Sequence, residues 1–256
     1  MLRAKGEFHA TLALRSGSTI DIGPGCCYPA GMRHPIPDPS SCLASGPVVD
    51  SDAFEVRQFA ARALSCVGSE SSEARTIALY YAVRDGLRYD PYSFSVDPVT
   101  FKASHVAAQT VSWCVPKAIL LTAALRAADI PAAVGFADVR NHLTTPKLRE
   151  RMGTDSFINH GYTAVWLHER WIKITPAFNA ALCERFGVHP LEFDGKSDAL
   201  FHEFDRENRR HMEYVADHGF VAEPDLDALI AEYRAAYPRL VAVAAGAASK
   251  DEAFQG

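Results

Sequence analysis

The sequence has little of what marks membrane, nucleic-acid-binding or disulfide-stabilised proteins. No run of about 18 apolar residues could span a bilayer, and the first nine residues lack the apolar centre of a signal peptide. Lysine and arginine form no basic stripe in a chain of 256 residues with a net charge of −5, which argues against nucleic acid and anionic membranes as partners. We therefore expect a cytoplasmic protein that binds neither nucleic acid nor membrane.

Signals for disulfides, metals and cofactors are also weak. Six cysteines are too few for a disulfide scaffold in a chain of this length, and the cytoplasm would keep them reduced. Neither the cysteines between positions 26 and 42 nor the histidines between 202 and 218 have the spacing of a common zinc site. There is no glycine-rich phosphate loop and no internal repeat. The sequence predicts no metal and no cofactor.

The composition, 48% hydrophobic and 22% charged, is typical of a globular protein. Residues 6–14 and 18–22 alternate around a polar turn and predict an N-terminal hairpin. Residues 23–50 are rich in proline and glycine and predict an irregular loop, which could cover a site or simply connect two regions. We expect residues 1–50 to precede one main domain over 51–243, followed by a flexible tail over 244–256.

The stretch over residues 112–128 constrains the function most. Apolar residues follow Cys114 at helical spacing (Ala118, Leu121, Leu125 and Ala128). Because Pro116 is tolerated only in a first helical turn and Ser112 can act as a cap, Cys114 should lie at the helix start, with Lys117 and Arg126 on the opposite face. A helix N-terminus stabilises a thiolate, so Cys114 is a candidate nucleophile. The alternative is a small buried core cysteine.

A second segment begins with His160. Strands over 160–167 and 171–175 should flank the turn at 168–170, and a strand over 132–139 should lie beside the histidine strand. Helices are expected over 51–67, 72–86, 180–186 and 225–237, and a strand and turn over 191–195. The polar segment 140–158 should flank the site, where Arg140 and His142 could contact substrate. These elements predict an α+β fold.

A cysteine that opens a buried helix, followed by a histidine that opens a strand, resembles the transglutaminase-like superfamily, whose chemistry is papain-like. The resemblance covers roughly residues 75–180. It implies a nucleophile helix packed on an antiparallel sheet, with residues 51–243 as the catalytic domain, Cys114 as nucleophile and His160 as general base. The family has an Asp at the end of the next strand, and this sequence has Thr175 there.

Three residues are candidates for orienting His160. Thr175 occupies the position of the family's Asp, Asp138 could supply a carboxylate from the neighbouring strand, and Asn179 could play the part that an Asn has in papain-like enzymes. Gln109, five residues before the thiol, could help to bind an oxyanion. Trp113 is either core or a wall of the acyl pocket.

The reaction implied by the resemblance is acyl transfer through a thioester, on a small-molecule amide or a peptide substrate. Water or an amine would resolve the thioester, giving hydrolysis or amide formation. Two alternatives remain at this point. An acyltransferase would use the same two residues on an acyl thioester, either a small molecule or one held by a carrier protein. A catalytically inactive binding module would explain the missing Asp.

Overall fold

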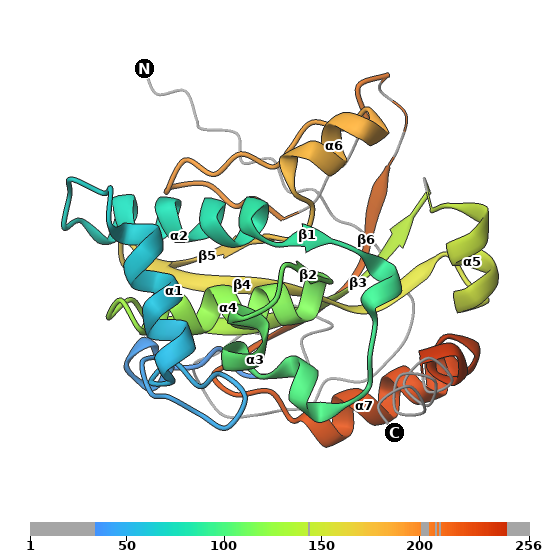
Figure 1. The fold of residues 1–256 in the computed structure, drawn as a ribbon, viewed down its shortest axis with the longest axis horizontal. Helices are drawn as coiled ribbons and strands as arrows, with labels where there is room; N and C mark the ends of the chain where they lie inside the picture. Colours follow the sequence, from blue (N-terminus) through green and yellow to red (C-terminus); the bar gives the residue numbers. More distant parts are fainter. Residues whose placement is uncertain (1–33, 143, 201–204, 208, 210, 245–256) are drawn as a thin grey trace, which may run out of the picture.

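A computed structural model describes residues 34–142, 144–200, 205–207, 209 and 211–244. The hairpin expected over 6–22 and all but the first residue of the expected tail lie outside these residues. The described helices are α1 (Phe54–Leu64), α2 (Ser72–Gly86), α3 (Ala103–Ala107), α4 (Cys114–Arg126), α5 (Pro146–Met152), α6 (Ala180–Phe186) and α7 (Leu226–Ala236) (Figure 1). The described strands are β1 (Arg88–Tyr89), β2 (Val111–Ser112), β3 (Ala132–Asn141), β4 (Ser156–Leu167), β5 (Arg170–Ile174) and β6 (Met212–Val221).

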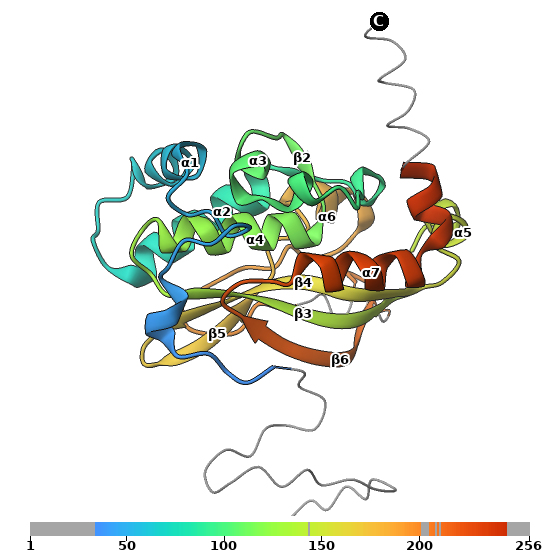
Figure 2. The same cartoon turned by 90° about the horizontal axis from the view of Figure 1, so that it is seen from below.

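An antiparallel sheet in the order β5-β4-β3-β6 forms the centre of the fold, and α4 and α7 lie on one of its faces (Figure 2). A short parallel pair, β1 with β2, leads directly into α4. The predicted α+β class is confirmed. The strand expected over 132–139 does lie beside the histidine strand, and Ala137 is opposite His160 in the register.

Helix α4 is buried along its whole length, because β3 and β4 cover one side of it and α1, α2 and α3 pack against the others. Thr163 Oγ1 donates a hydrogen bond to the carbonyl of Ala118 at 2.9 Å. The expectation that Lys117 and Arg126 form a separate polar face is wrong, since both are buried. The Lys117 ammonium donates to the carbonyls of Arg84 and Leu87 at 2.9 and 2.6 Å, which satisfies the end of α2.

The hairpin of β4 and β5 matches the expected strands to within a few residues. Its turn residues, His168 and Glu169, have φ values of 52° and 60°. A two-residue turn with positive φ at both positions fits the right-handed twist of the flanking strands. Glycine or asparagine would adopt these angles more readily, so the packing of the two strands sets the turn here.

The C-terminal half departs from expectation in two places, although α6 and α7 form as predicted. No strand forms over 191–195, because side chains of α2 satisfy that backbone. Tyr80 Oη and Arg84 Nη1 donate to the carbonyl of Leu191 at 2.9 and 2.6 Å, and Tyr81 Oη accepts from the N–H of Phe193. Strand β6 was not predicted, and register shifts interrupt its pairing with β3.

The segment 140–158 is more ordered than expected. Strands β3 and β4 extend into it from both sides, with α5 between them. Of the two candidate substrate contacts, Arg140 forms a surface ion pair with Asp155 at 3.6 Å, and His142 Nε2 lies 3.3 Å from Glu213 Oε2. Among the described residues, no helix combines the length and apolar character needed to cross a bilayer.

Candidate active site

Cys114 is the first residue of α4, as predicted. The expected cap is wrong: Ser112 lies in β2, and no side chain caps the helix at Trp113. An uncapped N-terminus leaves backbone N–H groups of the first turn without intrahelical partners. These groups and the positive end of the helix dipole therefore face the region of the thiol, where they favour a negative charge.

Gly161, the residue after His160, allows β4 to contact this helix start. A Cβ atom at Gly161 would lie 2.7 Å from Val115 Cα and 3.2 Å from the carbonyl oxygen of Cys114. Atoms at such distances overlap, and the first of them is backbone that cannot rotate away. Glycine at this position thus brings the histidine strand against the first turn of α4.

Burial keeps both candidate catalytic groups neutral. It raises the pKa of the Cys114 thiol to about 11, although the nearby backbone N–H groups of Gly161, Val115 and Cys114 act in the opposite direction. Burial also lowers the pKa of His160 to about 4. At pH 7 the site holds a neutral thiol and a neutral imidazole, which is the form of histidine that can accept a proton.

Cys114 and His160 line one small cavity of about 40 Å³, which we call the thiol cavity. Its other walls include Tyr89, Phe94, Trp113, Tyr233 and Tyr237. Trp113 is thus both core and cavity wall, since its ring also packs 5.0 Å from that of Phe94 between ring centroids. A cavity of this volume holds a few waters at most. A substrate would have to reach the thiol from a larger space.

The three candidates for orienting His160 differ in their partners. Asp138 accepts hydrogen bonds from His218 Nε2 at 2.8 Å and from the N–H of Asn159 at 3.0 Å. Asn179 Oδ1 accepts from the N–H of Tyr89 at 3.0 Å. The structure therefore gives both of these side chains other partners.

Thr175 is the candidate whose surroundings best fit the role of orienting His160. Thr175 and His160 line one cavity of about 10 Å³, about the volume of a single water. Thr175 Oγ1 is buried and has no hydrogen-bond partner among the described residues. A buried hydroxyl without a partner is costly, so it is available to a ring N–H or a bridging water.

Gln109 lines neither the thiol cavity nor the larger pocket beside it. Its side chain is exposed, and its amide donates to the carbonyl of His105 at 3.4 Å. Gln109 lies in the short connection between α3 and β2. The oxyanion role of Gln109 stays a prediction without support from these contacts, whereas the N-terminus of α4 places N–H donors beside the thiol.

Sequence reasoning missed the residues that hold the chain just before His160. Asn159 has a φ of 50°, a left-handed conformation that asparagine tolerates. Its side-chain amide donates to Glu232 Oε2 at 2.6 Å, and its carbonyl accepts from Tyr233 Oη at 3.1 Å. With Asp138 on its N–H, Asn159 is fixed on three sides by β3 and α7. The only sequence signal for this conformation is the asparagine itself, because asparagine adopts a positive φ more readily than most other residues.

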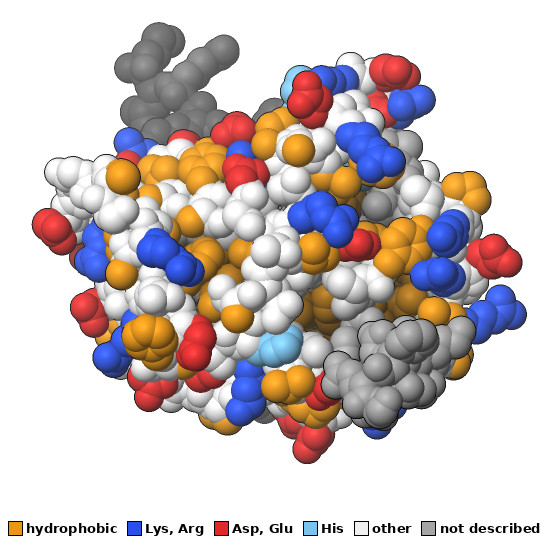
Figure 3. All heavy atoms as spheres, viewed as in Figure 1, with side chains coloured by type: hydrophobic (Ala, Val, Ile, Leu, Met, Phe, Trp, Pro, Cys, Tyr) orange, Lys and Arg blue, Asp and Glu red, His pale blue; other side chains and the backbone are white. Residues whose placement is uncertain are grey.

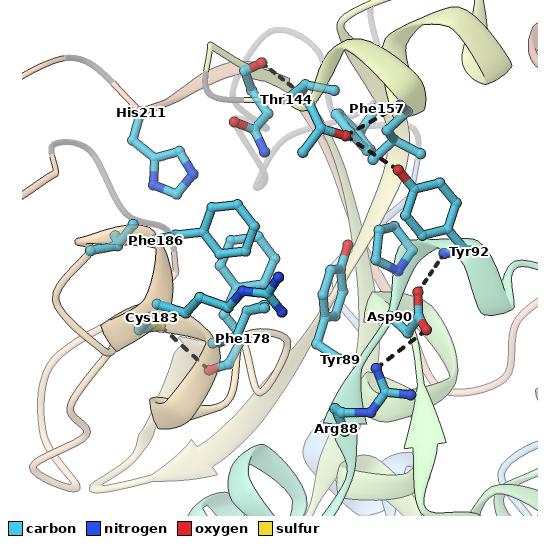
Figure 4. A pocket seen from close by; sticks show the side chains of 17 residues that line it. Arg88, Tyr89, Asp90, Tyr92, Thr144, Phe157, Phe178, Cys183, Phe186 and His211 are labelled. Atoms are coloured by element: carbon cyan, nitrogen blue, oxygen red, sulfur yellow. Dashed lines mark hydrogen bonds and ion pairs between the residues drawn. The ribbon is translucent and has the colours of Figure 1, made fainter.

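A larger space, which we call the outer pocket, adjoins the thiol cavity and shares Tyr89, Pro91, Leu148 and Phe157 with it. Its volume is about 340 Å³, at the small end of the range for ligand pockets. Figure 4 shows aromatic side chains from both sides of the pocket, Tyr89 and Phe178 among them, with ring centroids 4.7 Å apart. Among the described residues, no group of three or more His, Cys, Asp or Glu side chains could hold a metal.

The model of the Transglutaminase-like superfamily matches residues 58–176. Residues 58–176 form a transglutaminase-like core. The matched segment contains Cys114, His160 and Thr175, so the resemblance found in the sequence is confirmed. Most of the outer pocket's remaining wall, from Phe178 onward, lies beyond this transglutaminase-like segment.

One solved structure, described as a "putative cysteine protease" from Cytophaga hutchinsonii, is similar to this chain with 16% identity and a TM-score of 0.39. The similarity covers 52% of this chain and 40% of that chain, so it spans about two fifths of the length of the solved protein. No curated protein matches the chain. Helices α6 and α7 and strand β6 lie outside the segment that matches the family model.

Proposed function

We propose that this protein is a cysteine-dependent enzyme that transfers an acyl group from an amide or peptide-like substrate through a thioester. One observation carries the proposal: Cys114, at the uncapped start of α4, and His160 line the same cavity, beside a pocket large enough for a ligand. A core cysteine without a function would not need a buried histidine and an adjoining apolar pocket.

In the first step, Cys114 Sγ attacks the carbonyl carbon of the substrate and forms the S–C bond. The thiol proton passes to the neutral imidazole of His160 and then to the leaving amine as the C–N bond breaks. The carbonyl oxygen gains negative charge during attack, and N–H groups at the start of α4 stabilise it. Because both groups are neutral before attack, proton transfer accompanies bond formation.

In the second step, water or an amine attacks the thioester, and His160 takes the proton of the attacking group. The S–C bond breaks and the thiol is restored. Thr175 orients the imidazole, either directly or through one water in the cavity that the two residues share. A hydroxyl stabilises the imidazolium less than a carboxylate would, so we expect slower turnover than with an Asp at this position.

A second candidate is a binding module without catalysis, which is favoured by Thr175 at the family's Asp position, where its hydroxyl has no hydrogen-bond partner in the part of the chain that the structure describes. The same pocket would then bind an acyl compound without reacting. A third candidate is an acyltransferase, in which Cys114 and His160 act as above but the acyl donor is a thioester, including one on a carrier protein.

Intact-protein mass spectrometry separates these cases. The protein is incubated with N-acyl 4-nitroanilides and with the same acyl groups as thioesters, and any adduct is mapped by peptide analysis. The proposal predicts release of 4-nitroaniline and an acyl adduct on Cys114 that is absent in Cys114→Ala and retained in Cys66→Ala, a change at an exposed thiol. Adducts from thioesters alone would indicate the acyltransferase. Turnover that persists in Cys114→Ala would refute covalent catalysis at this thiol.

A further inference from the structure

The outer pocket combines an apolar interior with a positively charged rim. Phe157, Phe178 and Phe186 line it, and the ring of Phe178 stacks on that of His211 at a centroid distance of 6.0 Å. Burial lowers the pKa of His211 to about 4, so this ring is neutral at pH 7 and acts as a flat wall. Such surfaces suit an aromatic or long apolar group.

Cations dominate the rim. Arg185 lines the pocket from α6, and no acidic side chain among the described residues lies within ion-pair distance of it. Arg88 also lines the pocket and is exposed, with Asp90 at 3.4 Å as its partner. Asp90 is the one carboxylate among the described residues that line this pocket.

Two further cations lie over the ring of Tyr92, which closes the side of the pocket nearest α5. Lys147 Nζ is 5.5 Å and Arg151 Cζ is 5.0 Å from the ring centroid. Figure 3 shows lysine and arginine side chains around apolar surface in the region between α6 and α5. The whole chain has a net charge of −5, so this concentration of positive charge is a local departure from the rest of the molecule.

We infer that the outer pocket selects acyl compounds that carry an anionic group, a carboxylate or a phosphate, on an aromatic or long apolar body. This inference rests on the proposed function, because it names the substrate class of the same site. The apolar body occupies the space between Phe157 and Phe178. The anionic group lies at the rim, where the Arg185 guanidinium can form two parallel hydrogen bonds to it. The reacting carbonyl is then directed toward the thiol cavity.

Calorimetric titration of the full chain tests the inference without requiring turnover. The probes are 4-phenylbutyrate, 2-phenylethyl phosphate and the neutral 4-phenylbutyramide, measured at low and at physiological salt. We expect either anion, or both, to bind at least about tenfold tighter than the amide, and the preferred anion identifies whether the carboxylate or the phosphate is the natural group. If neither the carboxylate nor the phosphate binds more tightly than the amide, or if no probe binds measurably, the inference is overturned.

Variants assign the effect to the rim. Arg185→Gln should weaken binding of the preferred anion about tenfold and leave the amide unchanged, whereas Arg185→Lys should retain part of the preference. The control is Arg149→Gln, which removes an exposed arginine of α5 that does not line the pocket. Equal losses in Arg185→Gln and Arg149→Gln would point to general charge and refute the site. The same titration with Cys114→Ala should keep the preference, so failure of the catalytic proposal and failure of this one give different results.

Discussion

A single methyl group at Gly161 should disturb the contact that brings His160 against the helix of Cys114. In Gly161→Ala the new Cβ would lie 2.7 Å from Val115 Cα and 3.0 Å from Val115 Cγ2. Real Cβ atoms do not approach other heavy atoms at the shorter distance, so β4 and the first turn of α4 must move apart. The displaced atoms are those that position the thiol.

The size of the effect follows from two opposing contributions. Overpacking of a tight interior costs about 1–3 kcal/mol, while alanine restricts the unfolded chain and returns about 0.4–1 kcal/mol. We expect Gly161→Ala to lower the free energy of unfolding by about 1–2 kcal/mol, which is roughly 2–8 °C in melting temperature for a chain of this length. Gly86→Ala is the matched control, because nothing lies within 4 Å of a Cβ there. It should leave stability unchanged or raise it by up to about 1 kcal/mol.

Urea unfolding followed by tryptophan fluorescence measures both variants, and iodoacetamide labelling quantified on the Cys114 peptide measures access to the thiol. Gly161→Ala should lose stability and label faster, since the helix start is pushed off the strand. Gly86→Ala should label at the wild-type rate. Equal stability and equal labelling of the two variants would refute the idea that Gly161 sets the spacing between His160 and Cys114.

Four further predictions concern the same region. Because burial raises the pKa of Cys114 to about 11, its alkylation in the ligand-free protein should accelerate about tenfold per pH unit between pH 7 and 10; a flat rate from pH 6 upward would instead show a preformed ion pair. Burial lowers the pKa of His160 from 6.5 to about 4 in the folded protein. Because the unfolded chain binds this proton more readily, the free energy of unfolding should fall by about 3 kcal/mol as the pH drops from above 6.5 toward 4. Urea titrations at pH 7 and 4.5 should therefore show that His160→Gln loses less free energy of unfolding at the lower pH than the wild type does. An equal loss in both proteins would contradict this. Asn159→Gly, which accepts a φ of 50°, should be about 1 kcal/mol more stable than Asn159→Ala, and the reverse order in urea unfolding would exclude strain at this residue. Thr175→Ala should slow acylation with little change in KM and Thr175→Asp should restore or raise it, whereas unchanged kinetics in Thr175→Ala would remove the orienting role.

Features with local signals could be predicted from the sequence. The start of α4 followed from Pro116, and α7 followed from its apolar stripe after Asp225, which caps the helix by accepting from the N–H of Ala228. The pairing of the cysteine helix with the histidine hairpin followed from the order of elements. For the two helices, the residues that decide the structure lie within a few positions of one another, whereas the pairing of cysteine and histidine was implied by the family resemblance.

The remaining features depend on residues far apart in the chain. Burial of Lys117 is tolerated only because the carbonyls of α2, some 30 residues earlier, accept its protons. The partners of Asp138 come from β6 and from the left-handed residue before His160. The outer pocket joins segments from residue 88 to residue 211. No local pattern contains such information.

The contacts of Arg126 limit how far the chain can be shortened without loss of stability. Its guanidinium is buried and donates to the carbonyls of Ala44, Ala132 and Ala222 at 2.7, 2.8 and 2.5 Å. Ala44 and Ala222 both lie outside residues 58–176, the segment that the family shares. An excised fragment of that segment would leave a buried cation with one acceptor residue of three, a loss of several kcal/mol. The segment that matches the family model is therefore smaller than the segment that folds stably, and we expect an independently stable fragment to need the chain from before Ala44 to beyond Ala222.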